Sequence, residues 1–242
     1  MKKQILLIDN TFDPPHGSPE IRDYLEQIAK ELGLEIEVTA ARAPEGGIPA
    51  DLSRFQGAVL SGSKTRIDEQ APWIEKEMAA IRELHAKKIP TFAICYGEQL
   101  IAKTFGADAG RHDITGVAKE MEHGWAEIEV IADSPILSGL PKKFFSFQNH
   151  KDAVRELPAN FKLSATNAAC AVQAYELTDA PMWGVQFHPE RGFDEGNRAL
   201  DNRLKENPAY PALNRANAKD VYNPAVGATM FRNFLKWIAK NG

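Results

Sequence analysis

The chain of 242 residues has few of the features that mark secreted, membrane-bound or nucleic-acid-binding proteins. Its two cysteines, Cys95 and Cys170, provide no disulfide framework, which favours a reducing compartment. No apolar run is long enough to span a membrane, and the run near the N-terminus is too short for a signal peptide. The net charge of −4 argues against the clustered basic surface that nucleic acids require. We therefore expect a cytoplasmic protein with no membrane and no nucleic-acid partner.

The first part of the chain alternates between short apolar runs and amphipathic stretches. The apolar runs predict buried strands at 4–9, 35–40, 58–60 and 91–94. The amphipathic stretches predict helices at 18–32, at 72–87 and from Gly97 onward. Strands that alternate with helices are typical of an α/β fold, so we predict a doubly wound, mostly parallel central sheet flanked by helices.

The sequence pattern changes after Phe105. Short alternating segments separated by turn signals predict added antiparallel strands at 125–131, 144–147, 161–165, 171–175 and 182–187. The polar segment 191–227 is interpreted as an atypical insertion of loops and short helices, and an amphipathic helix is predicted at 228–240. Residues 1–242 are expected to form a single domain.

Cys95 stands at the corner between the predicted strand 91–94 and the helix that follows it. Such a corner lifts a side chain above the sheet edge, as in a nucleophile elbow. The nearby helix N-terminus favours a thiolate. Because free cysteines are often buried for packing alone, a structural cysteine is an equally good interpretation of these residues by themselves.

His188 provides the second signal, because it directly follows the predicted strand 182–187. In a parallel sheet it would share the carboxyl edge with Cys95, where α/β proteins place their sites. An imidazole can hold the thiol as a thiolate and later protonate a leaving amine. Glu190 can orient the imidazole as the third member of a triad.

These residues belong to motifs that resemble a known family. The stretch from Ala93 to Gln99 is similar to the nucleophile motif of class I (triad) glutamine amidotransferases, and Gly184–Glu190 is similar to their His-Pro-Glu motif. Leu60–Ser63 resembles the loop that forms their oxyanion hole. The segments 122–125 and 147–150 resemble those that flank or line the glutamine pocket in GMP synthetase and carbamoyl-phosphate synthetase. The joint occurrence of the cysteine and His-Pro-Glu motifs is highly specific.

The resemblance implies a class I glutamine amidotransferase-like, flavodoxin-like fold and a hydrolytic mechanism. The Cys95 thiolate would attack the glutamine side-chain amide, and His188, oriented by Glu190, would protonate the departing ammonia and then activate water to cleave a γ-glutamyl thioester. Backbone N–H groups would stabilise the oxyanion. We expect these donors on Tyr96 and on Ser63, or on Gly62 if the loop is shifted.

The resemblance also implies a set of substrate-binding residues. Gln99 lies one helical turn after Cys95, where it would help to hold the substrate. Main-chain groups around 149–152 would hold the amino-acid end of glutamine. The predicted binding residues are therefore Gln99, Asn149, His150, Lys151 and Asp152. No cofactor and no metal site are expected.

The chain departs from the family pattern at several positions. Ser63 and Lys64 replace a glycine and a proline that usually follow the Leu-Ser-Gly stretch, and Glu98 stands where many members have histidine. The segment 191–227 is not typical of the family. It starts at the rim of the site, so it could act as a lid or as a docking surface. No Walker-type loop or ATP-pyrophosphatase segment is recognisable.

Three functions remain open at this point. The first is a glutaminase that passes ammonia to a separate synthetase subunit. The second is a stand-alone hydrolase of γ-glutamyl peptides or amides that uses the same triad. The third is a non-catalytic regulatory homologue, against which the intact Cys95, His188 and Glu190 argue. The matched motifs concern glutamine, so we favour the first.

Overall fold

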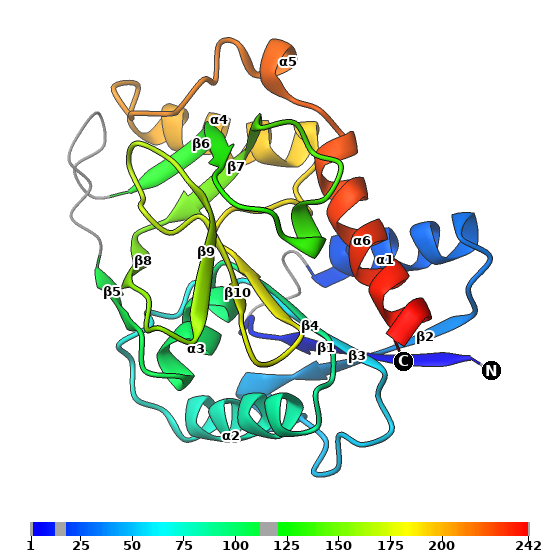
Figure 1. Cartoon of the computed structure of the whole chain (residues 1–242). Helices are drawn as coiled ribbons and strands as arrows, with labels where there is room; N and C mark the ends of the chain where they lie inside the picture. Colours follow the sequence, from blue (N-terminus) through cyan, green and yellow to red (C-terminus); the bar gives the residue numbers. More distant parts are fainter. Residues whose placement is uncertain (1, 13–17, 112–120, 242) are drawn as a thin grey trace.

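The computed structural model describes residues 2–12, 18–111 and 121–241. Its centre is a nine-stranded sheet in the order β2-β1-β3-β4-β11-β10-β9-β6-β7 (Figure 1). The strands of this sheet are β1 (Lys3–Asp9), β2 (Ile36–Arg42), β3 (Gly57–Leu60), β4 (Thr91–Ile94), β6 (Glu122–Val130), β7 (Lys143–His150), β9 (Phe161–Thr166), β10 (Ala174–Leu177) and β11 (Met182–Val185). The helices are α1 (Ser18–Glu31), α2 (Pro72–Ala86), α3 (Tyr96–Thr104), α4 (Phe193–Glu206), α5 (Ala218–Val221) and α6 (Ala225–Asn241), with short 3-10 turns η1 (Ala43–Glu45) and η2 (Pro135–Leu137).

The strands β2, β1, β3, β4 and β11 run parallel, in the order expected for a flavodoxin-like doubly wound sheet. The predicted α/β architecture is therefore confirmed. The remaining four strands of this sheet are antiparallel to their neighbours and extend it beyond β11. These are four of the five added antiparallel strands that the alternating segments predicted. The fifth, at 182–187, is β11, which pairs parallel with β4 and so belongs to the parallel half of the sheet.

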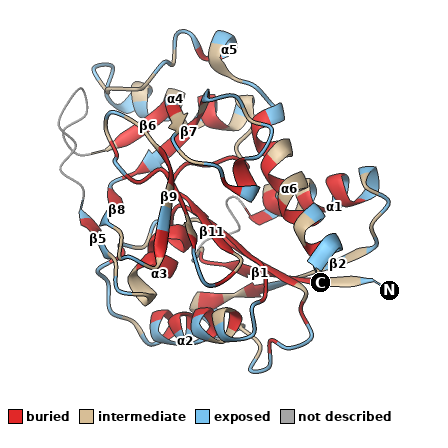
Figure 2. Cartoon of the chain, viewed as in Figure 1, coloured by how far each residue is buried: buried red, intermediate tan, exposed pale blue. Residues whose placement is uncertain are grey.

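The central parallel strands β3, β4 and β11 are fully buried because helices cover both faces of the sheet, whereas the edge strand β2 is only partly buried (Figure 2). Along β1, Ile5 and Leu7 pack in a core cluster with α1 and α6, whereas Leu6 and Ile8 pack in a second cluster with α2 and α3. Successive side chains of a strand point to opposite faces, so one short strand anchors both layers.

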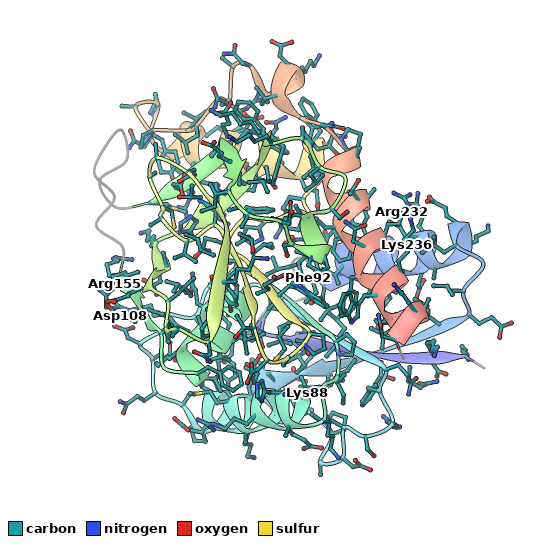
Figure 3. All side chains as sticks on the ribbon, in the orientation of Figure 1. Lys88, Phe92, Asp108, Arg155, Arg232 and Lys236 are labelled. Atoms are coloured by element: carbon teal, nitrogen blue, oxygen red, sulfur yellow. The ribbon has the colours of Figure 1, made fainter. Side chains whose placement is uncertain are left out.

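The centre of the α6 layer is aromatic. Phe92 on β4 lies in the interior of the molecule (Figure 3), in contact with the rings of Phe231 and Phe234 on α6. The predicted inward residues of the last helix, Met230, Phe231, Phe234, Leu235 and Ile238, are all buried. This confirms the amphipathic pattern, although the helix begins at Ala225 rather than at 228.

Two short strands were not predicted. β5 (Asp108–Arg111) and β8 (Asp152–Glu156) pair antiparallel in a small second sheet. Arg155 and Asp108 form a salt bridge across this pair at the edge of the molecule (Figure 3). The predicted strand at 171–175 is instead β10, which starts at Ala174, and Cys170 lies in the turn before it rather than on a strand.

The segment 191–227 contains a well-formed helix, which the sequence did not reveal. α4 is 14 residues long and packs on β6 and β7, where Trp125 and Phe147 form a third core cluster with Leu200. The Trp125 ring nitrogen donates a hydrogen bond of 3.2 Å to the Asn197 side chain. The segment is thus built onto the sheet through its own apolar core and is more ordered than the predicted loops and short helices.

The part of this segment that follows α4 is also hydrogen-bonded to the sheet. The backbone of Leu213 exchanges hydrogen bonds with β6, accepting from Trp125 at 3.0 Å and donating to His123 at 2.9 Å. Arg215 holds Asp201 of α4 with two hydrogen bonds of 2.7 and 2.9 Å. Within the described residues, no helix is both long and apolar enough to cross a membrane.

The start of α6 packs directly on the loop that follows β11. A Cβ atom at Gly227 would lie 2.1 Å from the carbonyl oxygen of Pro189, between His188 and Glu190. Because this neighbour is backbone, it cannot move aside without displacing the loop. We predict that Gly227→Ala lowers the free energy of unfolding by roughly 1–3 kcal/mol, as overpacking does. Chemical denaturation measures this change.

The matched control is Gly192→Ala, on the other side of the same loop. A Cβ at Gly192 meets no atom within 4 Å, and its backbone is extended. This variant should stay within about 1 kcal/mol of the parent. Equal stability losses for the two variants would contradict the proposed close packing of α6.

Candidate active site

Three loops meet where β3, β4 and β11 end. These strands are adjacent and parallel, with Leu60 opposite Ala93 and Ile94 opposite Val185. The residues that follow them, 61–64, Cys95 and 186–190, therefore emerge side by side at one edge of the sheet. Segments far apart in the sequence are brought together by strand order alone.

Cys95 occupies the sharp corner that the sequence predicted. Its backbone has φ 52° and ψ −110°, in the positive-φ region that non-glycine residues rarely adopt. The conformation is held from both sides, because the Cys95 N–H donates to Val185 at 2.8 Å and its carbonyl accepts from Gln99 at 3.0 Å. The side chain is buried and stands at the N-terminus of α3.

A glycine allows α3 to begin so close to the neighbouring strand. A Cβ at Gly97 would lie 2.7 Å from the Leu60 Cβ and 3.0 Å from the Leu60 carbonyl oxygen. The first turn of α3 is therefore pressed against the end of β3, where the loop 61–64 starts. The glycine in the cysteine motif thus has a packing reason.

His188 and Glu190 form a buried pair. The His188 Nδ1 lies 2.7 Å from a carboxyl oxygen of Glu190, and the His188 backbone N–H donates to Phe147 on β7 at 2.8 Å. Burial alone would lower the pKa of His188, but the negative charges of Glu190 and Cys95 outweigh it and raise the pKa to about 10. The other ring nitrogen, Nε2, is buried and has no well-formed hydrogen bond from the described residues, so it can serve the Cys95 thiol or a substrate.

Gly62 lies against both side chains. A Cβ at Gly62 would be 3.0 Å from the His188 Cε1 and 3.5 Å from the Cys95 Cβ, so a larger residue would press on both. The serine that follows keeps a backbone N–H, and neither Gly62 nor Ser63 has a positive φ. The loop 61–64 is thus in place beside Cys95, which is where an oxyanion donor has to be.

Gln99 and Asp152 belong to a buried hydrogen-bond network below this edge. The Gln99 side-chain amide donates to the Asp152 carbonyl at 2.7 Å and to the Gln186 side chain at 2.9 Å. The Asp152 carboxylate accepts the Ile67 N–H at 3.0 Å. In this arrangement Gln99 and Asp152 support the walls of the site, and their role in substrate binding stays a prediction.

His150 is tied into the same network. Its Nε2 lies 3.1 Å from the Glu122 carboxylate and its Nδ1 lies 3.1 Å from the Asp152 carbonyl oxygen, so both ring nitrogens face oxygen atoms. Glu122 also accepts from Asn167 at 2.8 Å and from Gln173 at 3.1 Å. His150 does not line the pocket described below, and its predicted role in substrate binding stays a prediction.

Glu122, His150 and Cys170 place one possible metal-ligand atom each within 4.8 Å of one another. Zinc accepts such a donor set. Here the carboxylate and the imidazole are already bonded to each other, and the Cys170 thiol donates to the Val172 carbonyl at 3.4 Å. Burial and the charge of Glu122 raise the pKa of Cys170 well above its usual range, which disfavours the thiolate that a metal requires.

A pocket of about 590 Å³ opens above the site. Gly62, Ser63, Asn149, His188 and Glu190 line it, whereas Lys151 is exposed outside this lining. The opposite wall comes from α4 and the loop before it, and consists of Arg191, Glu195, Ala199, Asn202, Arg203 and Glu206. The first part of the segment 191–227 therefore forms one side of the pocket, which agrees with its expected start at the rim of the site.

Glu98 lies below Cys95 as a fully buried acid. Burial, and next the charge of Cys95, raise the pKa of Glu98 well above its usual range. Its side chain packs against β11, since a Cβ at Gly184 would be 2.6 Å from the Glu98 Cγ. A neutral Glu98 adds no negative charge that would oppose a thiolate at Cys95.

Comparison with known proteins identifies the same protein family that the sequence motifs resemble. The family model for class-I glutamine amidotransferases matches residues 20–206, which is most of the chain. The chain belongs to this family.

Individual proteins that are similar to the chain are subunits of GMP synthases. The chain is 41% identical over 175 residues to a subunit of the glutamine-hydrolysing GMP synthase of Pyrococcus abyssi, covering 72% of this chain and 86% of that protein. It is 34% identical over 203 residues to the corresponding GMP synthase subunit of Methanopyrus kandleri, covering 83% of this chain and 97% of that protein.

Solved structures share the fold. A glutamine amidotransferase from Thermotoga maritima superposes with a TM-score of 0.79 over 100% of both chains at 23% identity. A glutamine amidotransferase from Methylobacillus flagellatus gives a TM-score of 0.75 at 19% identity, covering 99% of this chain and 95% of that one.

The His188–Glu190 pair generates a direct prediction. Because the charge of Glu190 is the larger of the two that raise the pKa of His188, Glu190→Gln should lower that pKa from about 10 by roughly 1–3 pH units. The protonated ring is the form that the pair stabilises, so this stabilisation is lost as the pH rises through the folded-state value. NMR titration of the His188 ring measures the change. Glu195→Gln, in the same pocket, is the control, and a His188 pKa that is the same with and without Glu190 would contradict the pairing.

Proposed function

We propose that the chain hydrolyses the side-chain amide of glutamine, with Cys95 as nucleophile, His188 as acid and base, and Glu190 as the residue that orients His188. The convergence of these three residues at one sheet edge, with Gly62 in contact with two of them, carries the proposal. Membership of the class-I glutamine amidotransferase family supports it.

The steps follow from the positions of the groups. The Cys95 thiolate adds to the amide carbon, and backbone N–H groups of Tyr96 and of Ser63 or Gly62 hold the oxyanion. The imidazolium of His188 gives its proton to the nitrogen, the C–N bond breaks and ammonia leaves. His188 then takes a proton from water, which attacks the γ-glutamyl thioester and releases glutamate and the thiolate. The raised pKa of His188 suits the first of these transfers, because it keeps the ring protonated beside the thiolate.

The ammonia acceptor is proposed from the relatives. The curated proteins described above are named as subunits of a glutamine-hydrolysing GMP synthase. We propose that this chain likewise passes ammonia to a separate synthetase subunit, in the cytoplasm and without a cofactor of its own. We further propose that the whole chain acts as one amidotransferase domain that includes 191–227, which the pocket wall formed by α4 supports.

The nucleophile is tested by substitution. Cys95→Ala should lower kcat for glutamine hydrolysis by a factor on the order of 10⁴ or more, because no other side chain can form the thioester. Cys170→Ala is the control and should change kcat little, since this thiol is buried away from the pocket. Glutamate release, with circular dichroism to verify folding, measures both. Near-parental activity of a folded Cys95→Ala protein would refute the mechanism.

A second candidate is a hydrolase of larger γ-glutamyl compounds. Ammonia needs almost no space as a leaving group, whereas the pocket of about 590 Å³ continues from His188 to α4. Arg203 and Asn202 on α4 face this space and could contact the amine portion of a γ-glutamyl peptide. This observation favours a wall that selects the substrate over a purely external docking surface.

The two candidates differ in how they respond to α4. If the pocket takes a larger leaving group, Arg203→Ala should raise KM for γ-glutamyl dipeptides several-fold and leave KM for glutamine nearly unchanged. Arg198→Ala, exposed on the same helix and outside the pocket lining, is the control. Efficient turnover of glutamine with no measurable turnover of γ-glutamyl dipeptides would exclude the second candidate.

A further inference from the structure

His123 of β6 lines the candidate pocket with one ring nitrogen left unused. The residue is 3% exposed, and its Nε2 is buried without a hydrogen bond from the part of the chain that the structure describes. A buried polar atom without a partner is costly, and an apolar residue of similar size would avoid that cost. The free nitrogen of a pocket-lining side chain is available to a molecule that enters the pocket.

His123 lies close to the candidate triad. Its cross-strand neighbour is Asn149 on β7, which also lines the pocket. Its ring meets Phe147 edge to face, with the ring centroids 5.6 Å apart, and the Phe147 carbonyl accepts the backbone N–H of His188 at 2.8 Å. Phe147 therefore contacts both histidines, and a molecule bound beside His188 shares the pocket with His123.

The segment 191–227 fixes His123 from another side. The Tyr210 hydroxyl lies 2.9 Å from the His123 Nδ1, and the two rings meet edge to face with centroids 5.6 Å apart. The Leu213 N–H donates to the His123 carbonyl at 2.9 Å. Because both the ring and the backbone are held, the direction of Nε2 is set before a ligand binds.

The hydrogen bonds of Tyr210 indicate which chemistry Nε2 offers. The Tyr210 hydroxyl also donates to the Met121 sulfur at 3.2 Å. A hydroxyl has one hydrogen, so the Tyr210 oxygen accepts from Nδ1, and Nδ1 carries the ring hydrogen. Burial, and next the charge of Arg203, lower the pKa of His123 to about 4, so the ring is neutral near pH 7. Nε2 is then an unprotonated acceptor.

We propose that His123 is a specificity-determining residue whose Nε2 accepts a hydrogen bond from an N–H group of the substrate, and that Tyr210 sets its tautomer. Glutamine has two such groups, the α-ammonium and the side-chain amide. In this arrangement the segment 191–227 acts on the substrate by fixing His123. The inference rests on the proposed function, because it concerns how the substrate of that reaction is held.

Steady-state kinetics with glutamine tests the contact. His123→Phe keeps a ring beside Phe147 and Tyr210 but has no acceptor, so kcat/KM should fall roughly 5- to 50-fold. His123→Gln should stay within about threefold of the parent, because its side-chain oxygen can accept in place of Nε2. A parental kcat/KM in His123→Phe would overturn the proposal.

Tyr210→Phe tests the tautomer, because Tyr210 is outside the pocket lining. Without the hydroxyl, Nδ1 loses its acceptor and the ring hydrogen can move to Nε2. We expect kcat/KM to fall roughly 3- to 10-fold, and this loss should not add to that of His123→Phe. Tyr222→Phe is the matched control, since it removes a hydroxyl from the same segment while the Tyr222 ring contacts Trp125. It should leave kcat/KM unchanged.

Glutaramate, which is glutamine without the α-ammonium, identifies the donor. If the ammonium is the donor, His123→Phe should affect the kinetics of glutamine through KM alone and leave those of glutaramate unchanged. If the side-chain amide is the donor, kcat/KM should fall equally for both substrates. Either result, together with the retained activity of His123→Gln, supports the contact.

NMR of the ring nitrogens gives a readout that a purely structural role would not move. In the parent Nε2 should be unprotonated, and glutamine added to Cys95→Ala should shift its resonance. If the parent releases no glutamate from glutamine, the proposed function fails on that measurement alone, and this shift still decides the role of His123. A protonated Nε2 in the parent, or a resonance that glutamine leaves in place at every concentration, would refute that role.

Discussion

The parallel pairing of β3, β4 and β11 is the constraint on which the rest of the site depends. Because these strands are adjacent and parallel, the loops that follow them emerge at one edge of the sheet. This makes Gly62, Cys95 and His188 neighbours. This edge of the sheet is tightly packed. Gly62 and Gly97 occupy positions where a Cβ would meet a neighbouring loop or strand, so backbone packing itself places the candidate nucleophile.

Charged and neutral acidic side chains occupy different positions around this edge of the sheet. The His188–Glu190 pair lies beside the pocket, and the negative charges around His188 favour a protonated ring. Below it, Glu98 and Glu77 are buried acids whose pKa values are raised by burial, so both are neutral near pH 7. Glu190 therefore provides a negative charge next to the imidazole, whereas the neutral Glu98 adds none next to the thiol. This distribution suits a reaction in which negative charge develops on the substrate.

The segment 191–227 contributes both to the hydrophobic core and to the wall of the pocket. α4 is attached to β6 and β7 through Trp125 and Phe147, and it carries Asn202 and Arg203 to the pocket wall. Its sequence is mostly polar, and only Gly196, Asn197 and Leu200 are buried. A Cβ at Gly196 would lie 2.9 Å from the Trp125 and Phe147 rings, so the helix is placed by a small residue fitting between aromatics. The helix is amphipathic but has few apolar residues, so much of its stability comes from the surface on which it lies.

The sequence by itself predicted the alternating strands and helices of the parallel half and identified Cys95, His188 and Glu190 as the candidate triad. Short continuous apolar runs that alternate with amphipathic stretches favour strands buried on both faces, and the motifs directly follow such runs, at the predicted strand ends. Only the tertiary structure decided which polar groups are buried together. In the sequence Glu77 is an ordinary polar position of a helix and His150 is a residue near the pocket, yet Glu77 is fully buried and His150 is paired with Glu122. Burial and hydrogen-bond partners depend on elements distant in sequence, and a local pattern contains no record of them.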